Sequence, residues 1–431
     1  MSKKVLIITY YWPPAGGIAV QRWVKLSKYL VREGWQPVIY TVSNGNYPHT
    51  DQSMAKDISP EITVIKRPIW EPHRLYQLIS PKKNKGDTHE ISQHKKSLIG
   101  KISTWVRSNF FIPDARMFWI KPSVNFLCGY LQKHPVDAVL STGPPHSAHL
   151  IAMKVKKKMN LPWLADFRDP WTTMDYYHDL LLTKRADRKH HQLELEVLCQ
   201  ADAVTVVGER MKEEFEQKRE GEVVVITNGF DEEDFSGSVQ PDQNFSIVYV
   251  GSFFDRINPV NFWRVLGELK KQKHPLAHRL KIRIIGQVAQ GVLASIDENN
   301  LQPELQIVPF QPHEVAIQEI KKAAVLLMGV DVRTKFVLTG KLFEYLGAHR
   351  PILAFGPPDG DAAAILTETR AGKMFSFEEE ESMRNYVVQL FQEWEQGQYA
   401  TSGRVQTYAH HVLAARVSSV LNRITTKPAV A

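Results

Sequence analysis

Short apolar runs alternate with amphipathic segments along most of the chain, and turn residues separate them. Val5–Tyr11 is apolar and leads through a Pro- and Gly-rich turn into the amphipathic segment Val20–Glu33, which stops at Gly34. The apolar run Pro37–Val42 follows directly. A strand, a helix and a second strand in this order form a βαβ unit, so this stretch predicts two parallel neighbouring strands.

The same rhythm continues through both halves of the chain. The further strand candidates of the first half are Ile62–Pro68, Asp137–Gly143, Pro162–Asp169, Ala201–Gly208 and Val223–Phe230. Those of the second half are Phe245–Phe254, Leu280–Gly286, Leu305–Pro312, Ala323–Val330 and Arg350–Pro357. Because these runs are continuously apolar, they indicate strands buried on both faces, as in a parallel sheet. We therefore predict an α/β protein with two Rossmann-like, doubly wound domains.

A polar, turn-rich stretch divides the two series of strands. Residues 230–244 read FDEEDFSGSVQPDQN, a composition typical of a linker. We therefore expect a first domain over residues 1–230 and a second over residues 231–400. The segment 401–431 is expected to be a C-terminal helix that crosses back to the first domain.

Composition places the chain among ordinary globular proteins. Of its 431 residues, 43% are hydrophobic and 23% are charged, which excludes wholesale disorder. The formal net charge of +8 suits anionic substrates or an anionic surface. The excess is too diffuse to indicate nucleic acid, and we expect no nucleic-acid partner.

Cysteine usage and hydropathy bear on the compartment. Cys128 and Cys199 can form neither a disulfide framework nor a cysteine zinc site, so a reducing compartment is expected. The apolar stretch at the N-terminus is too short for a signal peptide and predicts a strand instead. The sequence contains no run of 18 apolar residues, the length that a membrane-spanning helix needs. We expect a cytoplasmic protein, with binding at the inner face of the plasma membrane left open.

One region departs from the strand–helix rhythm. Pro81–Arg107 is rich in lysine and arginine and holds only Asp87 and Glu90 as acidic residues. Apolar and aromatic residues overlap and follow it: Trp105, Phe110, Phe111, Ile112, Met117, Phe118 and Trp119. Basic and aromatic residues together are typical of a segment that binds among lipid headgroups, here of an anionic membrane. A solvated loop followed by a core-packing segment is the equally weighted alternative.

The first candidate site follows the first strand. Gly16 and Gly17 lie between that strand and a helix, so the backbone could approach a phosphate and the helix N-terminus could bind it. The alternative is a simple tight turn. The turn lacks the GxGxxG fingerprint, and the second strand ends in Thr41, Val42 and Ser43 rather than in an acidic residue, which disfavours an NAD-binding fold.

Two further motifs of the first half lie at strand ends. His146 follows a Pro-Pro turn after a strand, although a lone histidine is more often structural. Asp166, Arg168 and Asp169 stand together in the motif DFRDPW. Charges at a strand end need a partner or a ligand, so they either contact hydroxyl groups of a ligand or brace the strand end through an Asp166–Arg168 or Arg168–Asp169 pair.

The strongest motif is TGKLFEYLGAHRPILAFG, residues 339–356. Thr339 and Gly340 open a short helix whose amides could bind a phosphate. Lys341 and Glu344 are three residues apart and therefore share one face of that helix. A cation followed by a carboxylate one turn later suits a nucleoside diphosphate, with Lys341 on the pyrophosphate and the carboxylate on the ribose. An ordinary surface salt bridge is the alternative.

A second cation is expected near this helix. Gly251 ends the first strand of the second domain, and Arg256 follows in the loop. Strand ends of an open α/β sheet share one edge, so Arg256 is expected to face the same ligand. A solvated arginine paired with Asp255 is the alternative.

Taken together, these motifs resemble retaining glycosyltransferases of family 4, which have the GT-B fold. The resemblance covers nearly the whole chain and is carried by the following segments: Tyr10–Gly17, Asp166–Trp171, Ile226–Asp231, Tyr249–Arg256 and Gly340–Leu353. In that family the C-terminal domain holds a nucleotide-sugar, and the N-terminal domain presents the acceptor across a cleft.

The resemblance assigns roles to individual residues. It implies that Glu344 binds the ribose, that the loop Val308–Phe310 binds the base, and that His146 lies near the donor sugar. It also implies that Arg256 and the backbone near Thr339–Leu342 hold the diphosphate. The candidate catalytic residues are thus Arg256, Lys341 and His146. The candidate donor-binding residues are Gly16, Gly17, Gly251, Val308, Phe310, Thr339, Gly340, Leu342 and Glu344, and the candidate acceptor or sugar contacts are Asp166, Arg168 and Asp169.

The sequence also departs from the family pattern. The first glutamate of the family's Glu-x7-Glu motif is replaced by Phe336, which leaves the identity of the donor sugar open. Ser252 stands where the family has an arginine, and Lys341 is expected to compensate. The charged residues Asp331, Arg333 and Lys335 of the preceding loop could face the sugar.

The resulting functional prediction is a glycosyltransferase. It would move a sugar from a UDP- or GDP-linked donor to an acceptor hydroxyl with retention, in cell-surface polysaccharide or lipopolysaccharide synthesis. No metal or other cofactor is expected, because cations and helix amides would stabilise the leaving diphosphate. The preferred acceptor is a lipid-linked saccharide. The alternatives are a non-catalytic GT-B scaffold in a polysaccharide assembly and a nucleotide-sugar epimerase.

Overall fold

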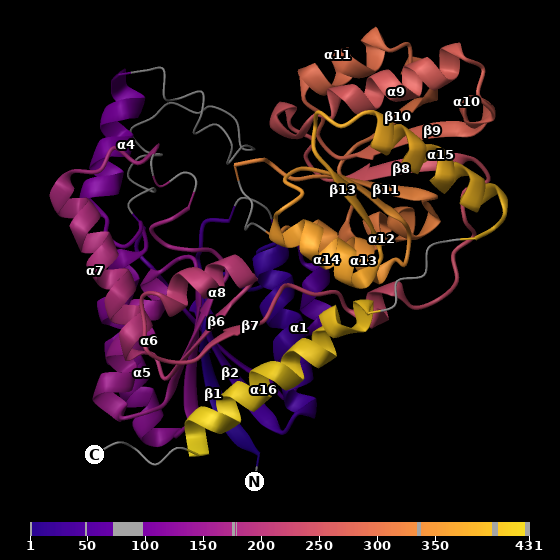
Figure 1. Cartoon of the computed structure of the whole chain (residues 1–431). Helices are drawn as coiled ribbons and strands as arrows, with labels where there is room; N and C mark the ends of the chain where they lie inside the picture. The colour runs from indigo at the N-terminus through magenta and orange to yellow at the C-terminus, as the bar shows by residue number, and fades with distance from the viewer. Residues whose placement is uncertain are drawn as a thin grey trace. The chain divides into compact units, whose positions relative to one another are not determined.

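The computed structural model describes residues 2–47, 50–71, 98–174, 177, 179–333, 338–398 and 404–426. The chain divides into two compact units, Met1–Thr227 with Leu413–Ala431 and Asn228–Val412 (Figure 1). Each unit is built on one sheet in which every strand pair is parallel. The predicted α/β class with two doubly wound, mainly parallel sheets is confirmed.

The first unit has a seven-stranded sheet with the order β3-β2-β1-β4-β5-β6-β7. Its strands are β1 (Lys3–Ile8), β2 (Trp35–Val42), β3 (Thr63–Arg67), β4 (Ala138–Gly143), β5 (Trp163–Phe167), β6 (Ala203–Val206) and β7 (Val223–Val225). All coincide with predicted apolar runs. The order reverses between β1 and β4, and ligands of open α/β sheets bind at such a switch point.

Helices cover both faces of this sheet. They are α1 (Ile18–Arg32), α4 (Leu98–Phe110), α5 (Met117–Lys133), α6 (Ser147–Met159), α7 (Lys184–Gln200) and α8 (Glu209–Glu216), with the 3₁₀ turn η1 (Ser53–Asp57). α1 buries Trp23, Leu26 and Leu30 on one sheet face, as its periodicity predicts. α5, α6 and α7 pack on the opposite face, so the strands are buried on both sides.

The second unit has a six-stranded sheet with the order β10-β9-β8-β11-β12-β13. Its strands are β8 (Phe245–Val250), β9 (Leu280–Ile285), β10 (Leu305–Val308), β11 (Val325–Gly329), β12 (Ile352–Phe355) and β13 (Gly372–Phe375). Sequence analysis predicts all but β13. The strand order reverses between β8 and β11.

The helices of the second unit also form two layers. They are α9 (Val260–Lys271), α10 (Pro275–Arg279), α11 (Gln290–Glu298), α12 (His313–Lys322), α13 (Gly340–Gly347), α14 (Asp361–Thr369) and α15 (Glu381–Glu395), with η4 (Asp255–Ile257) and η5 (Gln302–Glu304). One layer includes α9, α11 and α15. The other is formed by α12, α13 and α14.

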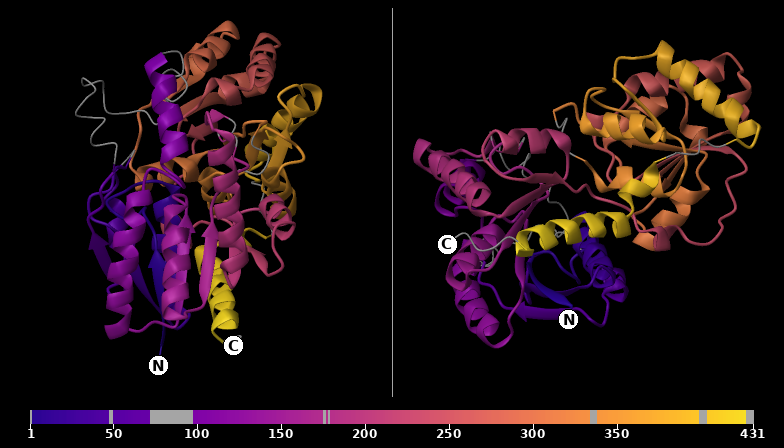
Figure 2. Two further views of the ribbon diagram at one scale, coloured as in Figure 1. Left: turned by 90° about the vertical axis from the view of Figure 1, so that its left-hand side faces the viewer. Right: turned by 60° about the horizontal axis from the view of Figure 1, so that its bottom comes forward.

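Two segments connect the units. The first contains η3 (Glu232–Phe235), and the second contains η6 (Val405–Tyr408) and α16 (His410–Thr426). Phe230 pairs with both sides of the second segment: its N–H donates to Tyr408 O at 3.1 Å, and His410 N–H donates to Phe230 O at 2.8 Å. From Leu413 onward, the apolar side chains of α16 pack with those of β1 and α1. Figure 2 shows the course of this helix in yellow.

Part of the predicted chemistry lies outside the described residues. This holds for residues 72–97, which carry most of the lysines of the basic segment, and for the side chain of Lys101. It also holds for Lys335 and Phe336. The C-terminal end of the basic segment is described and forms α4.

Candidate functional site

The carboxyl ends of β8 and β9 form a tight glycine junction in the second unit. Gly251 follows β8 with a φ of +109°, and Gly286 follows β9 with a φ of +128°. A Cβ atom on Gly286 would lie only 2.4 Å from the carbonyl oxygen of Gly251. Both positions therefore require glycine, and the lack of a side chain at Gly286 lets the two backbone segments approach closely beside β8, one strand of the switch point. Sequence analysis singled out Gly251 but not Gly286.

The Lys341 ammonium lies on this junction. A Cβ on Gly251 would be 3.1 Å from Lys341 Nζ, so the absence of a side chain makes room for the ammonium. Nζ donates a hydrogen bond of 2.6 Å to Tyr249 Oη, and Tyr249 in turn donates to Ser252 O. Burial lowers the pKa of Lys341 to about 8 against the opposing influence of Glu344. The ammonium is thus held in a poorly solvated position at the start of α13.

Glu344 lies one turn further along α13 and is mostly buried. Its Oε1 is 3.5 Å from Nδ1 of His313, whose Nε2 is 3.5 Å from Oδ2 of Asp234. The imidazole therefore lies between two carboxylates that come from distant parts of the sequence. His313 was not singled out by sequence analysis, because no local pattern links it to α13.

Arg256 is held beside the same strand ends. Its Nε pairs with Asp331 Oδ2 at 3.2 Å, and its guanidinium stacks on the Phe254 ring at 4.6 Å. The partner is thus Asp331 and not Asp255, the alternative considered from the sequence. Burial raises the pKa of Asp331, but hydrogen bonds from Arg333 and the charge of Arg256 outweigh it, so the carboxyl pKa lies below its usual range.

The other candidate donor-binding residues of the second unit differ in their exposure and in their hydrogen bonds. Thr339 is the N-cap residue of α13, but its side chain makes no capping hydrogen bond, and Gly340 is the first residue of the helix. The Leu342 side chain is fully buried, so only its backbone could face a ligand. Val308 ends β10 and accepts a hydrogen bond from Gly286 N–H at 2.9 Å. Phe310 follows and is the most exposed large apolar residue among those described, at 79%.

In the first unit the glycine turn lies where sequence analysis expects it. Gly16 and Gly17 connect β1 to α1, and Gly17 is the N-cap residue with a φ of +96°. A Cβ on Gly17 would meet no described atom within 4 Å, so this side of the turn is open. The turn therefore lies at the switch point of the first sheet.

His146 packs inside the first unit. Its ring stacks on Trp171 with a centroid separation of 4.3 Å and an interplanar angle of 2°. Burial, together with the charges of His149, His190 and Arg168, lowers the pKa of His146 far below its usual value. The imidazole is therefore neutral near pH 7, and within the described residues its Nδ1 has no hydrogen-bond partner.

Arg168 and Asp169 lie next to this histidine at the end of β5. Arg168 donates to Pro144 O and lies over the Tyr11 ring at 5.6 Å. Burial raises the pKa of Asp169, and the charge of Arg168 opposes the rise. β4 and β5 thus bring His146, Arg168 and Asp169 together at one edge of the sheet.

Asp166 belongs to a separate, internal network. Its carboxylate and the Arg22 guanidinium form an ion pair of 2.8 Å, and both side chains are only 1% exposed. Trp23, Thr142 and Thr205 donate three further hydrogen bonds of 2.8 to 2.9 Å to the same carboxylate. Burial raises the pKa of Asp166, but the Arg22 charge and these donors hold it below its usual range. The role of Asp166 in this network is structural, but its ion-pair partner is Arg22 and not Arg168, the partner considered from the sequence.

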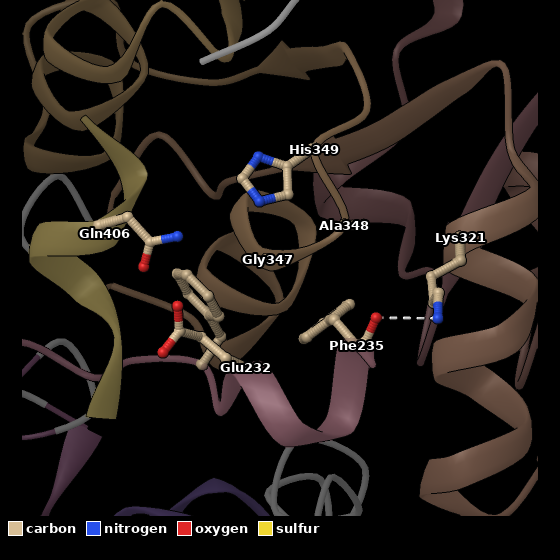
Figure 3. A pocket seen from close by; sticks show the side chains of 8 residues that line it. Glu232, Phe235, Lys321, Gly347, Ala348, His349 and Gln406 are labelled. Atoms are coloured by element: carbon tan, nitrogen blue, oxygen red, sulfur yellow. Dashed lines mark hydrogen bonds between the residues drawn. The ribbon is translucent and has the colours of Figure 1, made fainter. Parts of the chain in front are cut away.

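A cavity of about 220 Å³ lies at the other end of α13. Figure 3 shows its lining side chains, which include Glu232, His349 and Gln406. Lys321 lies at its edge and donates three hydrogen bonds of 2.8 to 2.9 Å to the carbonyls of Phe235, Ser236 and Gly237. The lysine is thus fully used in fixing the connecting segment. We place the candidate site at the N-terminal end of α13, where the strand ends and the cations lie.

The described residues contain neither a cluster of metal-binding side chains nor a helix that could span a membrane. No three histidine, cysteine or carboxylate side chains in the described ranges come together as a metal-binding group. Among the helices in the described part of the chain, none is both long and apolar enough to cross a bilayer.

Comparison with known proteins gives similarity of structure only. No protein-family model and no curated protein sequence matches the chain. Sucrose-phosphate synthase from Thermosynechococcus elongatus matches with a TM-score of 0.58 at 14% identity, over 98% of both chains. WaaG, a glycosyltransferase of lipopolysaccharide biosynthesis, matches with a TM-score of 0.55 at 12% identity, over 97% of this chain and 99% of its own.

A third solved structure widens the range of activities that share this architecture. A candidate UDP-N-acetylglucosamine 2-epimerase from Listeria monocytogenes matches with a TM-score of 0.57 at 12% identity, over 98% of this chain and 96% of its own. These matches, together with the two parallel sheets, show that the chain has the GT-B fold. Membership of family 4 stays a prediction.

Proposed function

We propose that the protein is a glycosyltransferase that moves a sugar from a nucleoside-diphosphate donor to an acceptor hydroxyl. The observation that carries the proposal is the partly desolvated Lys341 ammonium on the glycine junction of β8 and β9, at the first turn of α13. A diphosphate bound there would supply the negative charge that this ammonium lacks. Glu344, one turn deeper, would accept hydrogen bonds from the ribose hydroxyls.

The chemistry requires stabilisation of the departing diphosphate. As the bond between the sugar and the phosphate oxygen breaks, negative charge builds up on the diphosphate. Lys341, Arg256 and the first amides of α13 would stabilise this charge, and loss of one such group costs about 100- to 1000-fold in turnover. A diphosphate oxygen could take the proton of the acceptor hydroxyl, so no enzymic base is needed for retention. His146, buried and neutral, would contact the donor sugar and would not act as the base that takes the proton of the acceptor hydroxyl.

The proposed biological setting follows from the acceptor. We propose a UDP- or GDP-linked donor without a required metal, and a lipid-linked saccharide as acceptor, in polysaccharide or lipopolysaccharide synthesis on the cytoplasmic side of a membrane. Asp169 and Arg168 at the end of β5 would contact sugar or acceptor hydroxyls. The structural similarity to WaaG, whose description names lipopolysaccharide biosynthesis, supports this choice.

A thermal-shift screen of UDP-, GDP- and ADP-sugars tests donor binding. A ligand at 100 times its dissociation constant adds about 2.7 kcal/mol to the free energy of unfolding. The variant Lys341→Met should abolish the shift. Lys373→Met is the matched control, because both lysines lie over an aromatic ring of the second unit: Lys341 Nζ is 4.0 Å from the centroid of Tyr249, and Lys373 Nζ is 4.8 Å from that of Phe375. Equal shifts in both variants would refute the diphosphate assignment.

The same donors separate the rival functions. A transferase releases labelled sugar from the nucleotide only when an acceptor is present, whereas an epimerase changes the sugar while it stays on the nucleotide. The epimerase match makes this control necessary. A scaffold without activity need bind no nucleotide, so the absence of any thermal shift would favour it.

A further inference from the structure

Helix α4 has its apolar face toward solvent. Ile102, Trp105, Val106 and Phe110 recur at helical spacing and are 38 to 63% exposed. Among the described side chains of α4, only Ser108 is buried. The helix is attached to the unit by polar groups, since Asn109 donates to Leu181 O at 2.8 Å and accepts from Thr183 N–H at 2.7 Å. A helix that packs on a core buries its apolar face and exposes its polar face, so the orientation of α4 is the reverse of the expected one.

Aromatic rings continue this face beyond α4. Trp105 contacts Phe110 edge-on at 5.7 Å, Phe111 contacts Phe118 at 6.1 Å, and Phe118 contacts Trp70 at 4.7 Å. We call these five residues the aromatic ridge. Trp70 and Phe118 are 51% and 42% exposed, so exposed rings come from α4, from α5 and from the segment after β3. Contiguous exposed apolar surface of this kind marks an interaction site.

The charge beside the ridge indicates the partner. The start of α7 adjoins α4 through Thr183, and Figure 1 shows the two helices next to each other. Exposed cations gather there: Arg107, Lys184, Arg185, Arg188 and Lys189. The described carboxylates of the same stretch are Asp179 and Asp187. Cations at a helix N-terminus oppose the helix dipole, so their position is unfavourable for α7 itself and favourable for an external anion.

We infer that the aromatic ridge and the start of α7 dock the first unit on an anionic lipid surface. Tryptophan and phenylalanine prefer the headgroup region, and neighbouring lysine and arginine are attracted to anionic lipids. The docking stands on the first unit alone. That the membrane also supplies the acceptor, a saccharide on a lipid anchor, rests on the proposed function.

Co-sedimentation of the full chain with vesicles tests the docking. Vesicles of equimolar phosphatidylcholine and phosphatidylglycerol should carry the protein down, and pure phosphatidylcholine vesicles should carry down far less. Trp105→Ser/Phe110→Ser should weaken binding to the anionic vesicles by about 10-fold or more, because two exposed rings no longer insert. Leu195→Ser/Val260→Ser is the matched control, since both residues are exposed to a similar degree, 47% and 49%, away from the ridge.

The charge contribution is tested separately. Lys184→Gln/Arg188→Gln should weaken binding to the anionic vesicles, and the control Lys271→Gln/Lys281→Gln, in the second unit, should not. Binding should also fall in about 1 M salt, where the Debye length is about 3 Å. No binding of the wild-type chain to anionic vesicles, or equal binding of the ridge variant and its control, would overturn the inference.

Two other occupants of the ridge give distinct results. If the chain itself covers the ridge, Trp105→Ser/Phe110→Ser will lower the melting temperature far more than the control does. If a second copy covers it, the wild-type chain will dimerise without lipid and the variant will not. Either result overturns the docking and leaves nucleotide binding untouched. Conversely, vesicle binding without transfer to any acceptor would leave the docking intact and defeat the proposed function.

Discussion

The substitution Lys341→Met should remove nucleotide binding and yet stabilise the free protein. Burial lowers the pKa of Lys341 from 10.5 to about 8, which corresponds to about 3 kcal/mol of unfavourable free energy for the charged form at pH 7. Methionine removes this cost but also loses the hydrogen bond that Nζ donates to Tyr249 Oη, which is worth about 1 to 2 kcal/mol. Methionine has a similar length and no charge, so we expect the variant to be more stable by about 1 to 2 kcal/mol at pH 7.

The pH dependence of this difference has a definite sign. Between about pH 8 and 10.5 the unfolded chain keeps the proton on Lys341 while the folded chain has lost it. The stability of the wild-type protein therefore rises with pH relative to the variant, and the advantage of Lys341→Met shrinks. Urea unfolding of both proteins at several pH values from 7 to about 9.5 measures how their stability difference changes with pH. Lys373→Met, which removes an exposed ammonium, should change stability by less than about 0.5 kcal/mol.

Two results would refute this reasoning. A loss of more than about 1 kcal/mol in Lys341→Met at pH 7 would mean that the protein stabilises the ammonium and needs no ligand to do so. A stability difference that stays constant from pH 7 upward would mean that Lys341 titrates as an ordinary lysine. In both cases the Lys341 ammonium would not need an anionic ligand to offset the cost of its burial.

Three further predictions test the surroundings of this site and the core of the first unit. Asp166→Asn should destabilise the protein by about 3 to 5 kcal/mol in urea unfolding, because it leaves the Arg22 guanidinium buried without a counter-charge. Since the pKa of Asp166 is lowered, this wild-type advantage should be complete above the usual carboxyl pKa and shrink as the pH falls below it. Gly286→Ala should lower both the melting temperature and nucleotide affinity, because its Cβ would lie 2.4 Å from Gly251 O. Glu344→Gln should weaken binding of a nucleoside diphosphate about 10-fold with little change in binding of inorganic pyrophosphate, as measured by calorimetry, and equal losses would contradict the ribose assignment.

The strands of this fold could be predicted from the sequence because a strand that is buried on both faces forms a continuous apolar run. Each apolar run of the first half lies on a strand of the first sheet, and the same holds for β8 to β12. β13 was not predicted, because its four residues, Gly372–Phe375, include the exposed Lys373 and form no apolar run. Edge strands are covered on fewer sides, so their sequences are freer and carry a weaker pattern.

The candidate site could be predicted only where its residues are neighbours in sequence. Lys341 and Glu344 were found because helical spacing places them on one face. The partners that give these residues their properties come from elsewhere: Tyr249 from β8 for Lys341, and His313 from α12 for Glu344. The partner of Arg256, Asp331, comes from the loop after β11. Such pairings depend on the sheet order, which the sequence pattern leaves undetermined. Similarly, nothing within DFRDPW shows that Asp166 pairs with Arg22, 144 residues earlier.

The charged side chains at the strand ends of the two units have different surroundings, and this difference bears on function. In the first unit the Asp166 carboxylate receives an ion pair and hydrogen bonds from four surrounding side chains, so its burial is compensated within the protein. In the second unit the Lys341 ammonium donates one hydrogen bond to the neutral hydroxyl of Tyr249, lies over the same ring at 4.0 Å, and feels the charge of Glu344 without forming an ion pair with it among the described residues. The lowered pKa of Asp166 shows that its partners more than offset the cost of burial, whereas the lowered pKa of Lys341 shows that burial outweighs the favourable influence of its surroundings. Perturbed groups of the second kind cluster at sites where a ligand completes the charge balance.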